Sequence, residues 1–153
     1  MSTHERLLYR SINVLMRLML CSPLHALFSG RVMLLEVTGR RSGRTYVVPV
    51  GYVHGRENDV CFTSGRWSVW WKNLRGGAAV TARMRGRPLR GTARVVTEGE
   101  AVVRGLDAFL LKFPGTASRY GVRLNADGRP DPEDLQAAAR DGSAVMVVVE
   151  TGQ

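Results

Sequence analysis

The feature that most constrains the fold is a change of periodicity at Arg31. Beyond this residue, short runs rich in β-branched and aromatic residues alternate with glycine-containing turns, which is the pattern of β-strands. Six strands are expected, over Val32–Val37, Thr45–His54, Asp59–Ser64, Ala79–Arg85, Leu89–Val96 and Ala144–Glu150. Strands that are largely antiparallel, with few residues to spare between them, predict a small closed or split β-barrel.

Helical patterns flank these strands, so the predicted fold class is α+β, mainly β. Helices are expected over Val69–Arg75 with Ser68 as N-cap, from Thr97 to about Phe113, and over Leu135–Arg140, preceded by an N-cap at Asp131 and a first-turn proline at Pro132. The sequence has no βαβαβ pattern, which argues against a doubly wound nicotinamide-binding fold.

Residues 5–20 have helical periodicity, with Arg6, Arg10 and Arg17 on one polar stripe and a broad apolar face opposite. Arg17 interrupts the apolar run, so the segment is too short for a transmembrane helix or a good signal peptide. Two positions for this helix remain open. It packs on its own domain, or it lies on a membrane surface with its arginines in water.

Composition places the chain among globular proteins. A length of 153 residues with 44% hydrophobic and 23% charged residues predicts one domain, made of an N-terminal helical segment over 1–30 and a barrel over 31–153. Two cysteines form no disulfide framework, and no Cys/His cluster suggests a metal. We therefore expect no metal site and a cytoplasmic location, with membrane association left open.

Positive charge is concentrated in the middle of the chain. The formal net charge is +9, and residues 31–94 contain thirteen basic but only three acidic side chains. A basic field of this kind attracts anions. Nucleic acid, acidic lipid and an anionic small molecule are all compatible with it.

The first two expected strands enclose the sequence Thr38-Gly39-Arg40-Arg41-Ser42-Gly43-Arg44. Glycines allow backbone N–H groups to gather around an anion, and arginine guanidinium groups bind phosphate or carboxylate through two parallel hydrogen bonds. The spacing does not match a Walker phosphate loop. The turn therefore predicts an anion site, and the alternative is a solvated basic hairpin turn.

A second candidate region combines Thr63-Ser64-Gly65 at a strand end with Trp70-Trp71-Lys72-Asn73-Leu74. Adjacent tryptophans on a helix point about 100° apart. One is expected in the core, and the other can line a pocket for a flat ring. The alternative is that both only pack against the barrel.

These motifs together resemble the deazaflavin-dependent nitroreductase family, which includes F420H2-dependent quinone reductases. The resemblance is carried by Thr38-Gly39-Arg40-Arg41-Ser42-Gly43, by Val48-Pro49-Val50 with Tyr52, and by Trp70-Trp71-Lys72-Asn73-Leu74, within residues 24–150. It implies a split β-barrel like those of flavin reductases and pyridoxamine-phosphate oxidases. It also implies an F420H2-dependent reductase that passes a hydride to a hydrophobic, electron-poor acceptor such as a quinone, enone or nitro compound.

The same resemblance implies which residues contact the coenzyme F420, a deazaflavin with a phosphate and an oligoglutamate tail. The expected cofactor-binding residues are Arg40, Arg41, Ser42, Gly43, Arg44, Pro49, Thr63, Ser64, Trp70 and Asn73. Tyr120 is the expected catalytic residue, at a position where family members place tyrosines against the substrate. It is a candidate proton donor after hydride transfer, with solvent as the alternative.

Two other functions remain open at this stage. The same barrel could hold FMN or haem in place of F420. A non-enzymatic protein could instead bind nucleic acid through Arg83, Arg85, Arg87 and Arg90, although no helix-turn-helix, zinc or RNP motif supports this. We expect a small-molecule partner, no nucleic acid and an oligomeric state that includes a homodimer among its options.

Overall fold

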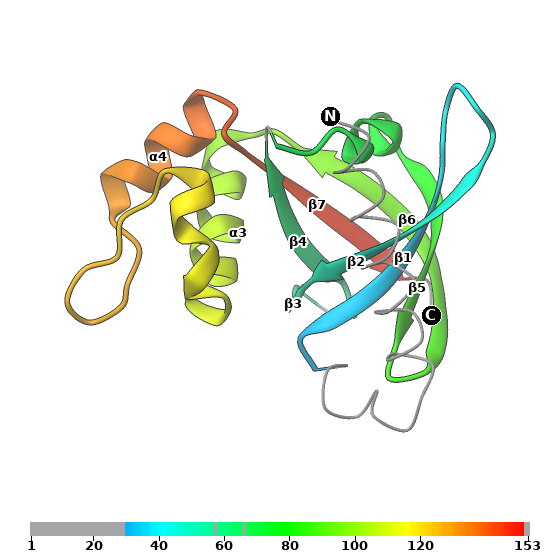
Figure 1. Ribbon diagram of the computed structural model, residues 1–153, viewed down its shortest axis with the longest axis horizontal. Coiled ribbons are helices and arrows are strands. Elements are labelled where there is room, and N and C mark those ends of the chain that lie inside the picture. The colour runs from blue at the N-terminus through cyan, green and yellow to red at the C-terminus, as the bar shows by residue number, and fades with distance from the viewer. Residues whose placement is uncertain (1–29, 57, 66, 152–153) are drawn as a thin grey trace, which may run out of the picture.

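The computed structural model describes residues 30–56, 58–65 and 67–151, and these form a strongly curved antiparallel sheet with the helices of residues 99–140 at one side (Figure 1). The strands are β1 Val32–Thr38, β2 Thr45–Gly51, β3 Val53–His54, β4 Val60–Gly65, β5 Ala78–Met84, β6 Arg87–Val96 and β7 Ala144–Thr151. The helices are η1 Trp70–Leu74, α3 Gly99–Lys112, η2 Pro114–Tyr120 and α4 Pro132–Arg140, of which η1 and η2 are 3₁₀ helices.

The sheet closes on itself through a single residue. Its strand order is β2-β1-β5-β6-β7-β4-β3, so β2 and β3 lie at opposite edges although only Tyr52 separates them in the chain. The Tyr52 amide donates to the Arg31 carbonyl at 3.1 Å. At this residue the chain stops pairing with β1, as β2, and begins to pair with β4, as β3. The predicted split barrel is therefore confirmed. The predicted strand Thr45–His54 is two strands, because one continuous strand could not pair with both edges.

The β5–β6 hairpin turns one residue earlier than predicted. Met84 pairs with Arg87, and the two residues between them, Arg85 and Gly86, have φ angles of 49° and 74°. Positive φ at both central residues matches the tight turn that suits the twist of two antiparallel strands. In this hairpin Arg83 is paired with Glu36 at 3.1 Å, which reduces the charge available to an external anion.

The helices differ from the predictions mainly in their type and caps. Helix α4 begins as predicted, because the Asp131 carboxylate accepts hydrogen bonds from the amides of Glu133 and Asp134. Residues 70–74 form a 3₁₀ helix, and its N-cap is Val69 where Ser68 was predicted. The carbonyl of Ser68 accepts a hydrogen bond from the Trp71 indole at 2.9 Å. The helix η2 was not predicted.

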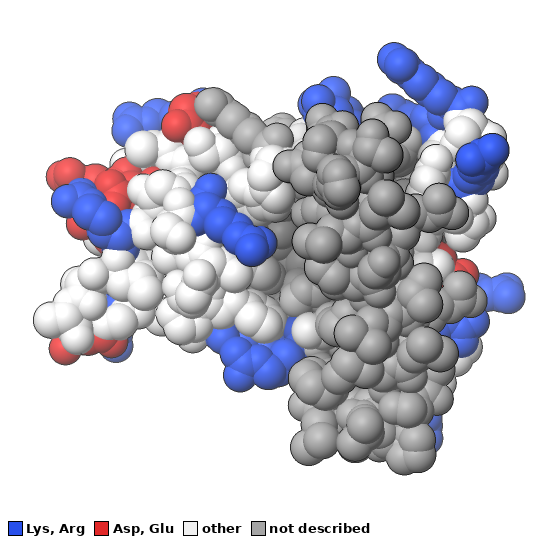
Figure 2. All heavy atoms as spheres, in the orientation of Figure 1, with Lys and Arg blue, Asp and Glu red and all other residues white. Residues whose placement is uncertain are grey.

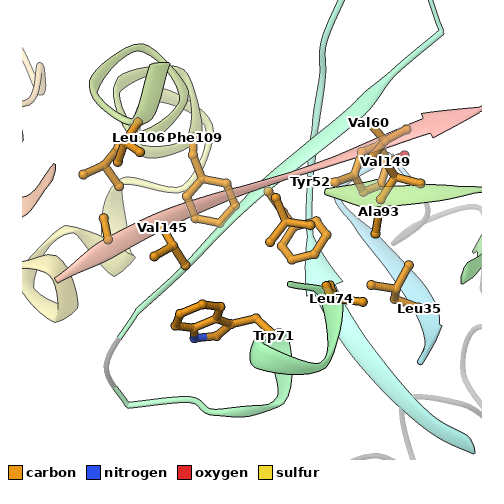
Figure 3. Close-up of a cluster of buried hydrophobic side chains, with 14 of the residues drawn as sticks. Leu35, Tyr52, Val60, Trp71, Leu74, Ala93, Leu106, Phe109, Val145 and Val149 are labelled. Atoms are coloured by element: carbon orange, nitrogen blue, oxygen red, sulfur yellow. The ribbon is translucent and has the colours of Figure 1, made fainter. Parts of the chain in front are cut away.

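The hydrophobic core lies between the curved sheet, α3 and η1 (Figure 3). Leu106 and Phe109 of α3 face Val145 of β7, while Trp71 and Leu74 of η1 cover the opposite part of the same cluster. The prediction that one of the adjacent tryptophans is a core residue is confirmed for Trp71, which is buried.

The predicted helix over residues 5–20 lies outside the described residues, and so does most of the proposed segment 1–30. Its packing and its relation to a membrane therefore stay predictions. Within the part of the chain that is described, no helix is long and apolar enough to cross a membrane.

Gly65, at the end of β4, occupies a space that excludes any side chain. A Cβ at this position would lie 2.5 Å from the Ser143 carbonyl oxygen and would also collide with the Trp67 ring. Gly65→Ala is therefore expected to destabilise the fold by about 1–3 kcal/mol, the usual cost of overpacking. Urea unfolding measures this. Gly115→Ala is the control, because nothing lies within 4 Å of its added methyl group, and equal losses in both variants would contradict the steric argument.

Candidate active site

The β1–β2 turn is a tight loop held by its own hydrogen bonds. The Gly39 amide donates to the Arg44 carbonyl at 2.8 Å, and the Gly43 amide donates to the Gly39 carbonyl at 2.9 Å. The Ser42 hydroxyl accepts from the Arg44 amide at 3.2 Å and lies 3.2 Å from the Tyr46 hydroxyl. A Cβ on Gly39 would be 2.8 Å from the Ser42 oxygen and 2.9 Å from the Tyr46 ring, so a side chain at this position would force both of these side chains to shift. The loop is thereby preorganised.

Basic side chains project from this hairpin into solvent (Figure 2). Arg41 and Arg44 are exposed, and among the described residues neither guanidinium has an ion-pair partner. Two unpaired guanidinium groups on one rigid turn form a donor set suited to phosphate and carboxylate oxygens. The predicted anion site therefore has the required chemistry.

Arg40 lies in a different environment from its two neighbours. Its amide donates to Asn73 Oδ1 at 3.0 Å, and its guanidinium donates to the carbonyl of Arg75. The Asn73 side chain also donates to the Trp70 carbonyl at 2.9 Å. The turn is thus attached to η1. Three of the predicted site residues, Arg40, Trp70 and Asn73, are brought together, and Arg40 and Asn73 lie 33 positions apart in the sequence.

Aromatic and hydroxyl side chains gather where η1 meets β4. Trp70 is half-buried and stacks on Phe62, with ring centroids 5.7 Å apart and planes inclined by 22°. Thr63 and Ser64 follow Phe62 and are buried. Strand β3 pairs only with Val60 and Cys61, so beyond Cys61 this edge of β4 has no strand neighbour among the described residues. Backbone groups along such an edge can bind a planar heterocycle.

Tyr120 is buried and engaged by Thr63. Its side chain is 4% exposed, and the two hydroxyl oxygens lie 2.7 Å apart. Burial raises the pKa of Tyr120 to about 12, although the hydrogen bond to Thr63 and the charge of Arg119 act in the opposite direction. The structure thus places Tyr120 beside a predicted cofactor residue, with its phenol neutral at physiological pH.

Two residues next to this region were not predicted. Trp67 is 44% exposed and packs edge-on against the Tyr120 ring at 4.7 Å. The Arg75 guanidinium lies 5.0 Å from the centre of the Trp71 ring, beside the contact with Arg40. Both residues are visible in the sequence, Trp67 as a third tryptophan and Arg75 as a basic residue just after the WWKNL segment. Their positions in the sequence, however, do not indicate that Trp67 contacts Tyr120 or that Arg75 contacts Arg40. Pro49, another predicted site residue, is half-buried in the middle of β2, opposite Leu34.

Residues 12–121 match the model of the family described as F420H(2)-dependent quinone reductase. The match covers more than half of the 153 residues. The chain belongs to this family. It is therefore an F420H2-dependent reductase, and F420 is its cofactor. A comparison with curated protein sequences gave no match.

Solved structures support the fold. An F420-H2 dependent reductase, FDR-A, is 18% identical with a TM-score of 0.56, over 78% of this chain and 94% of that one. A general stress FMN/FAD binding protein from Xanthomonas citri is 17% identical with a TM-score of 0.52, over 84% and 80%. A structure described as a domain-swapped dimer is 19% identical with a TM-score of 0.56, over 78% and 80%. At these identities the likeness concerns the fold alone.

The residues present fit an anionic deazaflavin. The exposed guanidinium groups of Arg41 and Arg44 suit its phosphate and carboxylates, and the flat face of Trp70 beside β4 suits its ring. Among the described residues, no group of three or more His, Cys, Asp or Glu side chains could hold a metal ion.

Proposed function

We propose that this reductase transfers a hydride from reduced F420 to a hydrophobic, electron-poor acceptor: a quinone, an enone or a nitro compound. The observation that carries the proposal is the direct attachment of the arginine turn to η1, through Arg40 and Asn73. This attachment sets an anion site and an aromatic ring site at a fixed separation on one scaffold. A ligand with a charged tail and a flat ring matches that pairing.

At the anion end, Arg41 and Arg44 bind the phosphate and the glutamate tail, while Ser42 and Gly43 shape the loop that presents them. Charge-assisted hydrogen bonds from guanidinium to phosphate are about twice as strong as neutral ones. The interaction is exposed, so added salt weakens it. This end anchors the cofactor and takes no part in the chemistry.

At the ring end, F420 supplies the hydride when it is bound, and the protein supplies position. Trp70, the outer edge of β4 at Thr63 and Ser64, and the middle of β2 at Pro49 are the proposed ring contacts. Holding the acceptor about 3–3.5 Å from the ring turns an encounter into an oriented step. The exposed Trp67 ring adds an apolar surface on which a quinone can stack.

We propose that solvent donates the proton that follows hydride transfer. Tyr120 has a positioning role, in which its hydroxyl group orients the side chain of Thr63. A general acid works best with a pKa near the working pH, and a phenol with a pKa of about 12 is far from it. Its hydroxyl is also directed to Thr63 at 2.7 Å. Tyr120 therefore orients Thr63 at the ring site from the buried side of β4.

Tyr120→Phe tests this assignment. The variant keeps the ring that packs on Trp67 and loses the hydroxyl, so we expect turnover to change less than about fivefold, with an unaltered pH profile. Stability should fall by about 1 kcal/mol for the lost hydrogen bond. Steady-state kinetics between pH 6 and 9 measure both kcat and its pH dependence. A fall in kcat of about 100-fold, within the range of general acid catalysis, would restore Tyr120 as the proton donor.

The function itself is tested by adding F420 to the purified protein and following the change in deazaflavin fluorescence. Turnover is then measured with a quinone, an enone and a nitroaromatic compound as separate acceptors. The proposal expects saturable F420 binding and oxidation of F420H2 by at least one of these compounds. Tight binding of FMN or haem with no binding of F420 would overturn it.

A homodimer is the assembly proposed for this protein. Support comes from one structure of the same fold that is described as a domain-swapped dimer. Light scattering on the purified chain should give a mass near twice 16.9 kDa, and a mass near 16.9 kDa would contradict the proposal.

A further inference from the structure

The β1–β2 turn is attached to η1 by hydrogen bonds within the protein, and anion binding by the turn does not require these bonds. Three hydrogen bonds cross or support this attachment. Arg40 donates its amide to Asn73 and its guanidinium to the Arg75 carbonyl, and Asn73 donates its amide group to the Trp70 carbonyl. We call this set the Arg40–Asn73 brace. All three involve backbone atoms, so they fix main-chain positions and not only side-chain orientations.

The guanidinium of Arg40 donates a hydrogen bond at the C-terminal end of η1. Arg75 is the C-cap of η1, and carbonyl groups at a helix C-terminus have no partner within the helix and attract cations. Gly76 follows with φ of 80°, and a Cβ there would lie 3.5 Å from Arg40 Nη2. The guanidinium thus lies against the chain where it leaves the helix. Arg40 is exposed like Arg41 and Arg44, but one of its guanidinium nitrogens is held by the Arg75 carbonyl.

We propose that Arg40 and Asn73 are positioning residues, whereas Arg41 and Arg44 provide guanidinium groups that bind the cofactor's anions. The brace fixes the anion turn relative to Trp70 before the ligand arrives. The identity of the anion rests on the proposed function, whereas the brace is a property of the cofactor-free protein.

A fixed separation between two subsites raises affinity because less conformational freedom is lost on binding. Among the described residues, the other connections of the turn to the fold are β1 and β2, which without the brace leave the tip of the turn free to move relative to η1. Arg41 and Arg44 then keep their charges but lose their fixed distance from the ring site. Loss of the brace therefore weakens binding without removing any cofactor contact.

Hydrogen exchange in the cofactor-free protein tests the brace directly. Asn73→Ala and Arg40→Gln should each accelerate exchange of the Arg40 amide, by about fivefold to tenfold for Asn73→Ala, which removes its acceptor. Arg41→Gln is the matched control, because it removes the same charge from the next residue and should leave this exchange unchanged. Asn73→Asp keeps an acceptor for the Arg40 amide and should restore slow exchange. Unchanged exchange in Asn73→Ala, or equal acceleration in Arg41→Gln, would overturn the proposal.

Titration with F420 at several salt concentrations provides the second readout. Asn73→Ala removes no charge, so it should weaken F420 binding about tenfold at every salt concentration. Arg41→Gln should instead weaken binding most at low salt. A pattern for Asn73→Ala that matches Arg41→Gln would contradict a positioning role. If the unmodified protein binds no F420, the proposed function fails, while the exchange result still decides whether the brace exists.

Discussion

Replacing Arg41 and Arg44 together with glutamine is expected to weaken F420 binding about 100-fold. A hydrogen bond to a charged group contributes about 1.5–3 kcal/mol, and each factor of ten in affinity corresponds to about 1.4 kcal/mol. We use the lower end for each arginine because both side chains are exposed and screened by solvent. Fluorescence titration at low ionic strength measures the change, and stability should stay within about 0.5 kcal/mol of the unmodified protein.

The matched control for this double variant is Arg87→Gln with Arg90→Gln. It removes two exposed arginines from β6, outside the anion turn, and therefore makes the same change in net charge. F420 affinity should fall by less than about threefold, through the weaker long-range field alone. Equal losses in the two double variants would show that net charge, and not the turn, determines binding.

Leu106→Ala is expected to lower the free energy of unfolding by about 2–5 kcal/mol. Leu106 lies on α3 with none of its surface exposed, inside the cluster formed with Phe109 and Val145 (Figure 3). Truncation removes buried apolar surface and leaves a cavity that rigid neighbours fill only in part. For a chain of this size a loss of about 3 kcal/mol lowers Tm by roughly 6–12 °C. Urea unfolding and thermal melting measure the two quantities.

Leu111→Ala provides the control on the same helix. Leu111 is five residues further along α3 and is 54% exposed, so the same truncation removes little buried surface. Stability should change by about 0.5 kcal/mol or less. If both variants lost the same stability, helix propensity and not core packing would account for the effect.

Strand alternation and turn residues were sufficient to predict a split barrel, and the structure has that fold. The error at Thr45–His54 is instructive. The sequence runs through Gly51 and Tyr52 without a clear break, yet the chain changes partner there, from β1 to β4. Nothing local distinguishes the two halves, because both are extended. Only the closure of the sheet makes Tyr52 the residue between its two edges.

The candidate site was predicted as a set of residues but not as an arrangement. The composition of the turn indicated anion binding, and the exposed guanidinium groups of Arg41 and Arg44 agree with that chemistry. Sequence could not separate Arg40 from these two, since the three arginines lie within five positions. Their different environments arise from the docking of η1, which brings Asn73 within 3.0 Å of the Arg40 amide.

By itself the sequence determined what depends on neighbours in the chain: the alternating strands, the Asp131 cap of α4, the glycine-bracketed turn and the family motifs. These features follow from backbone preferences and from hydrogen bonds that span a few residues. Only the tertiary structure decided that β2 and β3 close the barrel, that Arg40 caps η1, and that Thr63 lies 2.7 Å from Tyr120. Contacts of this kind join residues 35 and 57 positions apart. They depend on how the whole sheet curves around its core, and no local pattern records that curvature.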